Sequence, residues 1–299
     1  MTRGLTLHKV LHSRVLLVLG TLVALAVPVM TVPRLPHVSP WPLLIAMVPW
    51  VLAKYLLCPL RWRLLTPPGP EGRQTSSWHL RAYAEAELIG LATPGHVGAD
   101  VWRMRRLTKA GLGRGDAVLS VGLDRLVGAV GLTVFLAFAA TDLDSPLVII
   151  ALAVGVVLVV GALLARQYRP SLLPSGPLPS MKALALGFLI SAVFQISIAG
   201  LLLGAIAATG NSLSLWAIFG AFGASQLAGA VPGPNGASPR EAALVVALAA
   251  LGVPWLAATA AVTLKAALAW LPALTLGGIS LILLRRQTKA LSGLSVPAL

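Results

Sequence analysis

Long apolar runs, separated by short polar segments, dominate the hydrophobic pattern of the chain. About six of them are long enough to cross a bilayer, because a helix needs roughly 20 apolar residues to span the hydrocarbon core. They lie at about 14–32, 41–62, 116–140, 146–165, 182–208 and 255–284. The runs are continuous and rich in Leu, Ala, Val and Gly, whereas transmembrane β-strands alternate over about ten residues. The pattern therefore predicts an all-α integral membrane protein, built as a polytopic helix bundle.

Two further apolar stretches are interrupted by Pro/Gly turns. The first, at about 80–93, is too short to cross, ends in Thr93-Pro94-Gly95-His96-Val97-Gly98 and continues into a second short helix. The second, Leu215 to Val231, leads through Pro232-Gly233-Pro234-Asn235-Gly236 into a second arm from Pro239 to about Gly252. Counting crossings places both ends of the first stretch inside and both ends of the second outside. We predict two re-entrant hairpins from opposite faces, with turns at Pro94, Gly95 and Gly98 and at Pro232, Gly233 and Gly236.

The two turns share the pattern P-G-x-x-G-A, which indicates an internal repeat. The charged residues Arg125 and Lys265 each lie in the span that follows a hairpin. One transmembrane domain, residues 1–299, would then contain inverted halves at about 41–140 and 182–284. Alternatively, Pro and Gly recur by chance in a chain with 22 Pro and 29 Gly. Inverted repeats with broken helices at matching positions are typical of a binding site near the bilayer midplane.

Composition supports the membrane class and orients the chain. Hydrophobic residues make up 57% of the chain, charged residues 11%, and the mean hydropathy is +0.88, which excludes a water-soluble domain. A net charge of +14 would favour nucleic acid in a soluble protein. Here the bases cluster in short loops on one predicted face, as the positive-inside rule requires. We therefore predict a cell (cytoplasmic) membrane protein with both termini cytoplasmic, a retained first span rather than a signal peptide, and no nucleic-acid partner.

Charged residues inside predicted helices point to a site. Each costs about 2.5–3.5 kcal/mol at the bilayer centre, so such residues should face protein or water and pair with one another. Four bases and two acids occupy predicted spans or the second hairpin tip: Lys54, Asp124, Arg125, Arg240, Glu241 and Lys265. The positive surplus suits a phosphate-bearing headgroup, whose oxygens match arginine in particular. Lys54 alternatively extends its amine to the nearby interface.

Helix starts at the hairpin tips provide a second signal for an anion. Ser238-Pro239-Arg240-Glu241 has the form of a capping box with proline at the first helical position. Asp100 can cap the corresponding arm of the first hairpin. Two helix N-termini that face a common centre would present free amides and positive dipole ends. Alternatively, Asp100 and Glu241 only satisfy these backbone donors.

Other motifs limit the chemistry. The chain has no Walker loop, no GxSxG elbow, no HExxH and, with Cys58 as its single cysteine, no disulfide or cysteine metal site. We therefore predict no catalytic residue, no cofactor and no metal. Glu85 and Glu87 are expected to pair with Arg81 or nearby bases at the cytoplasmic side, and His96 to be a polar turn residue.

An ordered set of motifs resembles the flippase-like transmembrane domain of lysylphosphatidylglycerol synthases, which also occurs as stand-alone membrane proteins. The set comprises Arg61-Trp62-Arg63-Leu64-Leu65, Pro94-Gly95 with Gly98-Ala99-Asp100 and Arg103, Asp124-Arg125, and the Pro/Gly turn before Glu241-Ala242-Ala243. It covers about residues 15–285. The resemblance implies movement of an aminoacylated phospholipid or a polyprenyl-phosphate-linked lipid between leaflets. Since few residues follow Arg285, we expect no aminoacyl-transfer domain and no enzyme activity.

Charges and resemblance together define the predicted substrate-binding residues: Asp100, Arg103, Asp124, Arg125, Arg240, Glu241 and Lys265. The expected partners are membrane lipids with anionic headgroups, and a lipid-modifying enzyme is a candidate protein partner. Two other functions stay open. One is a secondary transporter of a small anion, which the same hairpins could serve. The other is a membrane-embedded transferase for lipid-linked substrates, with Asp100, Asp124 or Glu241 as its base.

Overall fold

The computed structural model describes residues 22, 26–27, 29–35, 38–70, 72–91, 93, 96–139, 178–228 and 238–293. Every named element in these residues is a helix and none is a strand, which confirms the predicted all-α class. Three helices are long and apolar enough to cross a membrane: Trp41–Leu65, Met181–Ala208 and Trp255–Arg286. They coincide with the predicted spans at 41–62, 182–208 and 255–284. The predicted span at 146–165 and most of the one at 14–32 lie outside the described residues.

The first long helix contains a π-helical segment. It consists of α3 (Trp41–Leu52), the π-helix η2 (Ala53–Leu57) and α4 (Cys58–Leu65). Pro59 has no amide hydrogen, and in a regular α-helix its ring would collide with the carbonyl of Tyr55, four residues earlier. The wider π turn lies where this conflict occurs and lets the helix continue. The last long helix also contains a π segment, η6 (Ala273–Gly277), between α12 (Trp255–Pro272) and α13 (Gly278–Gly293), although here the segment follows the proline, Pro272.

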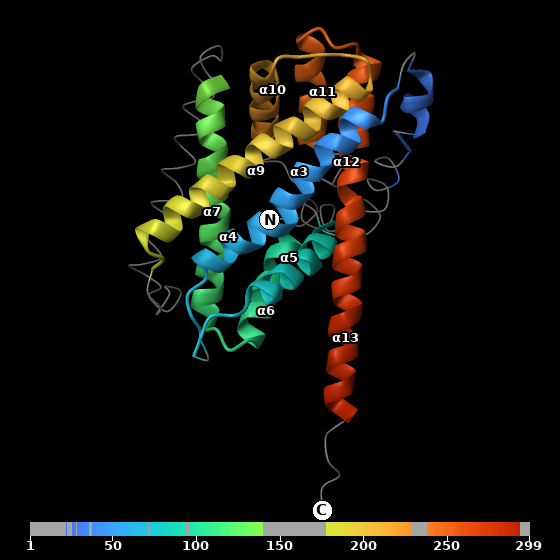
Figure 1. The fold of residues 1–299 in the computed structure, drawn as a ribbon. Helices are drawn as coiled ribbons and strands as arrows, with labels where there is room; N and C mark the ends of the chain where they lie inside the picture. The colour runs from blue at the N-terminus through green and yellow to red at the C-terminus, as the bar shows by residue number, and fades with distance from the viewer. Residues whose placement is uncertain are drawn as a thin grey trace, which may run out of the picture.

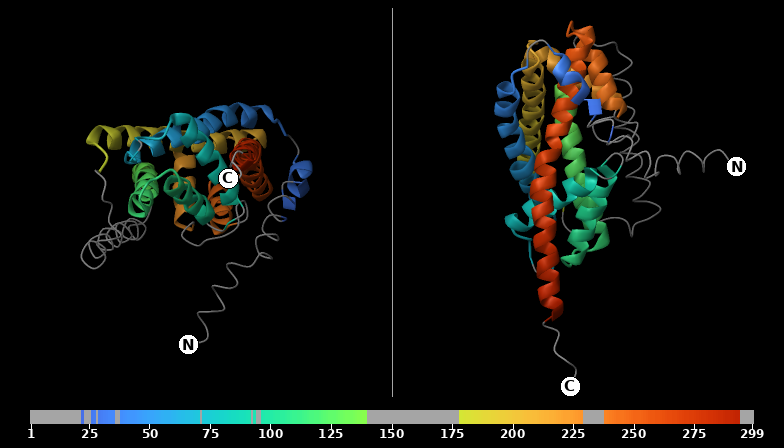
Figure 2. Two further views of the ribbon diagram at one scale, coloured as in Figure 1. Left: turned by 90° about the horizontal axis from the view of Figure 1, so that it is seen from below. Right: turned by 90° about the vertical axis from the view of Figure 1, so that its right-hand side faces the viewer.

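Two pairs of short helices occupy the predicted hairpin positions. α5 (Ser76–Leu91) packs against α6 (Val97–Lys109), and α10 (Leu215–Ala228) packs against α11 (Pro239–Ala250). Figure 1 shows the first pair in the lower half of the bundle and the second pair at the top, and Figure 2 shows the same separation from the side. Gly98 is described, whereas Pro94, Gly95, Pro232, Gly233 and Gly236 lie outside the described residues. That the pairs re-enter the membrane stays a prediction.

The order of elements recurs along the chain. A long helix, two short helices and a further long helix occur as α3–α4, α5, α6 and α7 (Arg114–Ala139), and again as α9 (Met181–Ala208), α10, α11 and α12. α7 matches the span predicted at 116–140, although its crossing of the membrane is untested. The recurrence has the element order expected of halves at 41–140 and 182–284. Their inverted relation remains a prediction.

α9 is the central packing element of the described bundle. It packs against α3, α4, α7, α10 and α12. Its contact with α3 is close, because a Cβ at Gly204 would lie 2.7 Å from the Pro42 carbonyl oxygen and 2.6 Å from Ala46 Cβ. Glycine is thus required for this approach. The close packing brings Ser191 of α9 to the side of α4 that carries Arg61, where the site described next is built.

Candidate functional site

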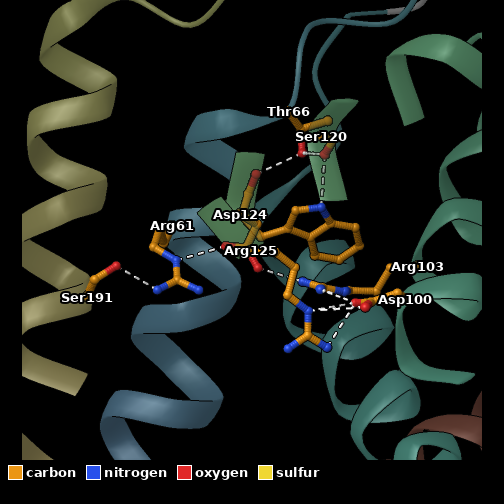
Figure 3. A network of polar contacts seen from close by, with 9 residues as sticks. Arg61, Thr66, Asp100, Arg103, Ser120, Asp124, Arg125 and Ser191 are labelled. Atoms are coloured by element: carbon orange, nitrogen blue, oxygen red, sulfur yellow. Dashed lines mark hydrogen bonds and ion pairs between the residues drawn. The ribbon is translucent and has the colours of Figure 1, made fainter. Parts of the chain in front are cut away.

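A buried carboxylate, Asp124 of α7, joins two arginines. Arg61 of α4 donates from Nε to Asp124 Oδ1 at 2.8 Å, and Arg103 of α6 donates from Nη1 to Oδ2 at 2.7 Å (Figure 3). The three residues are only 5%, 3% and 2% exposed for Arg61, Arg103 and Asp124. Arg61 Nη1 also donates to Ser191 Oγ of α9 at 2.7 Å. Four helices are therefore linked by charge-assisted hydrogen bonds.

The contacts continue from this buried centre to an exposed end. Arg103 Nη2 donates to Asp100 Oδ1 at 2.7 Å, and Arg125 Nε lies 3.1 Å from each Asp100 oxygen. The Arg125 side chain is 50% exposed and that of Asp100 is 26% exposed. We call Arg61, Asp100, Arg103, Asp124, Arg125 and Ser191 the Asp124 network. Its three arginines and two aspartates leave one positive charge in excess, and Arg125 is its accessible cation.

Aromatic rings and hydroxyl groups hold the buried arginine in place. The Arg103 guanidinium lies 5.3 Å from the Trp62 ring centroid and 5.5 Å from that of Tyr83. Trp62 is fully buried and donates from Nε1 to Ser120 Oγ at 2.9 Å, and Ser120 Oγ lies 2.7 Å from Thr66 Oγ1. Such cation–π contacts contribute about 0.5–2 kcal/mol each, more when desolvated. The orientation of Arg103 is thus fixed from two sides.

Membership of a family follows from comparison of the whole chain. The family model described as lysylphosphatidylglycerol synthase TM region matches residues 10–277, which include every helix of the Asp124 network. The chain belongs to this family. No curated protein and no solved structure is significantly similar to it. As a member of the lysylphosphatidylglycerol synthase transmembrane family, the chain is a membrane protein linked to lipid handling, and the resemblance drawn from its motifs is confirmed.

In this member of the family, the second set of predicted site residues forms a separate cluster. Glu241 accepts from the Ser238 backbone amide at 3.0 Å and bonds to the Ser238 hydroxyl, so the predicted capping box at the start of α11 is confirmed. Arg240 Nη2 lies 2.9 Å from Glu241 Oε1 and its side chain is 43% exposed. Lys265 of α12 interacts electrostatically with Arg240 and Glu241. We call these four residues the Lys265 cluster.

The side chain of Lys265 makes no hydrogen bond or ion pair to any part of the chain that the structure describes. The Lys265 cluster therefore has two bases for one acid, again one positive charge in excess. Within the described ranges, no hydrogen bond or ion pair joins it to the Asp124 network. The predicted meeting of both sets at one centre thus stays a prediction.

The first hairpin is capped differently from the prediction. His96 is the N-cap of α6, with φ 60°, and makes no side-chain cap bond. Asp100 lies four residues further on and pairs with arginines, so its predicted role as the cap was wrong. Thr93 Oγ1 instead accepts from the Gly98 amide at 3.0 Å. A Cβ at Gly98 would lie 2.6 Å from Thr93 Cγ2, so glycine lets the turn close onto this threonine.

The acids of α5 have other partners than Arg81. Glu87 Oε2 lies 2.8 Å from Lys54 Nζ and 3.4 Å from His96 Nε2. Glu85 Oε2 lies 3.2 Å from Arg106 Nε. Of the predicted partners, Arg81 or nearby bases, it is other bases than Arg81 that pair with these acids. Lys54 forms an ion pair inside the bundle rather than extending alone to the interface.

Sequence reasoning missed Arg61 and Ser191 as members of the network. Arg61 entered the prediction only as part of the motif Arg61-Trp62-Arg63-Leu64-Leu65, near the predicted inner end of its span. The signal that could have found it is the charge on Asp124, which needs a buried cation beyond its neighbour in sequence. No group of three or more His, Cys, Asp or Glu side chains suited to a metal ion occurs in the described ranges.

Proposed function

We propose that the chain translocates a lipid with an anionic or aminoacylated headgroup, either a phospholipid or a polyprenyl-phosphate-linked lipid, across the cytoplasmic membrane. It does so as a flippase, without chemical change of the lipid. The supporting observation is the accessible Arg125 at the end of a network whose other two arginines are buried. Family membership supports lipid as the substrate class.

The residues of the network have different roles in this proposal. Asp124, Arg61 and Arg103 form a frame, because both oxygens of the carboxylate are occupied and all three side chains are buried. Arg125 is the phosphate-binding residue, since a guanidinium can donate hydrogen bonds to two phosphate oxygens at once. Asp100 holds Arg125 until the phosphate arrives. The phosphate is attracted by the positive charge that the frame leaves uncompensated.

The Lys265 cluster provides a second position for the same headgroup. Lys265 has no ion pair with described residues, and Arg240 is 43% exposed with one acid nearby. A cation that no described acid pairs with directly costs free energy inside a helix bundle, and binding of an anionic headgroup would offset this cost. In the proposed cycle, the headgroup passes from Arg125 to this cluster while its acyl chains stay in the bilayer.

Translocation is tested with purified protein in vesicles that contain headgroup-labelled phosphatidylglycerol, using a membrane-impermeant quencher. Wild-type protein should make inner-leaflet label accessible faster than in protein-free vesicles. Arg125→Gln should slow this by about tenfold or more, because it removes a charge-assisted bond of about 1.5–3 kcal/mol. Arg114→Gln is the matched control, since Arg114 is an exposed residue of the same helix α7, outside the network.

Three results would contradict the proposal. Label movement equal to that of empty vesicles rejects a flippase. Uptake of a small anion without lipid movement would instead select a secondary transporter. A chemically altered lipid on extraction would select a transferase.

A further inference from the structure

A polar cavity distinct from the Asp124 network lies where α5, α6 and α13 meet. Its volume is about 190 Å³. Two arginines line it, Arg81 of α5 and Arg106 of α6, together with the hydroxyl residues Thr75, Ser77 and Ser280. The α13 wall also contributes Leu283 and Leu284, directly before Arg285-Arg286. Those bases mark the predicted cytoplasmic interface, so the cavity lies at this interface. We call it the Glu85 pocket, after the buried carboxylate at its wall.

The carboxylate of Glu85 is fully engaged by protein donors. Glu85 is 1% exposed, its Oε2 accepts from Trp102 Nε1 at 3.0 Å, and its Oε1 accepts from Ser280 Oγ at 2.9 Å. Its Oε2 also lies 3.2 Å from Arg106 Nε. Glu85 is thus a structural anchor for α6 and α13, and its charge offsets one of the two arginines, so that the pocket lining keeps one positive charge in excess.

The two arginines have unused donors. Arg106 stacks 5.3 Å from the Trp78 ring centroid, and beyond its ion pair with Glu85 its side chain donates no hydrogen bond to the described ranges. The side chain of Arg81 makes neither a hydrogen bond nor an ion pair with any described residue. Two guanidinium groups beside hydroxyls form a favourable site for phosphate oxygens.

The wall of the pocket indicates that this phosphate belongs to a lipid. Leu283 lines the cavity and is 39% exposed, and its helix also exposes Ile279 and Ile282, at 58% and 54%. An apolar surface therefore runs along α13 into a polar cavity. Acyl chains can lie along this surface while the phosphate reaches the arginines. A free phosphate ion has no apolar part that could pack against this wall.

We propose that the Glu85 pocket is a capture site, in which the phosphate of a cytoplasmic-leaflet phospholipid binds Arg81 and Arg106 before it reaches Arg125. α6 connects the two sites. Arg106 and Arg103 are three residues apart and therefore neighbours on one helix face, and Asp100 lies a further three residues along. Arg106 and Asp100 are therefore separated by about two helical turns of α6, which places the capture site close to the Arg125 end of the network. This inference rests on the proposed lipid translocation and adds a first binding step to it.

Binding is tested with the full chain in detergent and short-chain phosphatidylglycerol, by isothermal titration. Arg81→Gln should weaken lipid binding several-fold, and the double variant Arg81→Gln/Arg106→Gln should weaken it by about tenfold or more. Arg105→Gln is the control and should leave the affinity unchanged, because Arg105 is an exposed residue of α6 that does not line the cavity. Inorganic phosphate at the same concentration should not compete. The Arg81 side chain has no hydrogen bond or ion pair with the described residues to lose, so its variant tests the pocket even where Arg106→Gln impairs folding. Unchanged lipid affinity in Arg81→Gln, or full competition by inorganic phosphate, would overturn the capture site.

The vesicle assay separates this inference from the function it rests on. The Arg81→Gln variant should translocate slowly at low phosphatidylglycerol content and recover at high content, because only capture is impaired. Arg125→Gln should be slow at all lipid contents. If wild-type protein translocates lipid and Arg81→Gln translocates it equally fast at every lipid content, the capture site is refuted and the flippase is not. If lipid binding depends on Arg81 but wild-type protein translocates no lipid, the flippase is refuted and the Glu85 pocket remains a lipid-binding site.

Discussion

Replacing Asp124 by Asn should destabilise the bundle strongly while changing almost no volume. The carboxylate is 2% exposed and binds Arg61 at 2.8 Å and Arg103 at 2.7 Å. Asparagine keeps one acceptor oxygen, but it removes the charge that compensates two buried guanidinium groups. Breaking a buried ion pair from one side costs about 3–5 kcal/mol. Since Arg103 retains Asp100 and Arg61 retains Ser191, we expect the lower part of this range.

The measurement is the free energy of unfolding in mixed micelles, with the loss of near-ultraviolet signal from buried Trp62 as a second probe. Arg114→Gln is the control, because Arg114 is an exposed residue in the first turn of the same helix, where a change of charge costs only about 0.3–1 kcal/mol. The double variant Arg61→Gln/Asp124→Asn should recover part of the lost free energy of unfolding, because it removes one buried positive charge together with the negative one. A cost below about 1 kcal/mol for Asp124→Asn, as for an exposed pair, would refute the buried network.

Three more outcomes follow from the geometry. Gly204→Val should cost about 1–3 kcal/mol in thermal unfolding, because its side chain would collide with the Pro42 carbonyl, whereas Gly200→Ala, with open space around its Cβ position, should be neutral. Lys265→Gln should slow lipid translocation without lowering the melting temperature, since it removes a cation that lacks a described ion-pair partner; a marked loss of stability would show that the cation is structural. Ser238→Ala should cost about 1 kcal/mol of helix stability by removing the cap of α11, measurable as faster amide exchange at its first turn.

The elements could be predicted from the sequence because their signals are local. Apolar length located the helices at Trp41–Leu65, Met181–Ala208 and Trp255–Arg286, and the Ser238 to Glu241 spacing located the start of α11. Both depend on residues within a few turns of one another. The start of α6 was misplaced because Thr93 and the left-handed His96 close that turn, a local geometry that the preference for Asp at helix starts does not reveal.

The partners of the charges could not be predicted in the same way. Arg61 is 63 residues from Asp124 and 130 residues from Ser191, so their contact depends on how α4, α7 and α9 pack. The sequence indicates that a buried charge needs a partner, but not which of several bases supplies it. For Glu87, the nearby Arg81 was the natural candidate. Lys54 forms the pair instead, because helix packing brings η2 to the same side of α5.

The charges of the Asp124 network are buried and paired at one end and accessible at the other, so a phosphate can replace a carboxylate only at the Arg125 end. A headgroup that displaced Arg61 or Arg103 from Asp124 would leave buried charge without a partner, at a cost of several kcal/mol. Displacement of Arg125 from Asp100 is different, because Arg103 still holds Asp100 at 2.7 Å and Arg125 is already half exposed to its surroundings. Arg125 can therefore exchange a carboxylate for a phosphate with little loss, and the frame behind it stays closed. Reversible exchange of this kind is what a translocation site needs, since a site that held the phosphate as tightly as Asp124 holds its arginines would not release it.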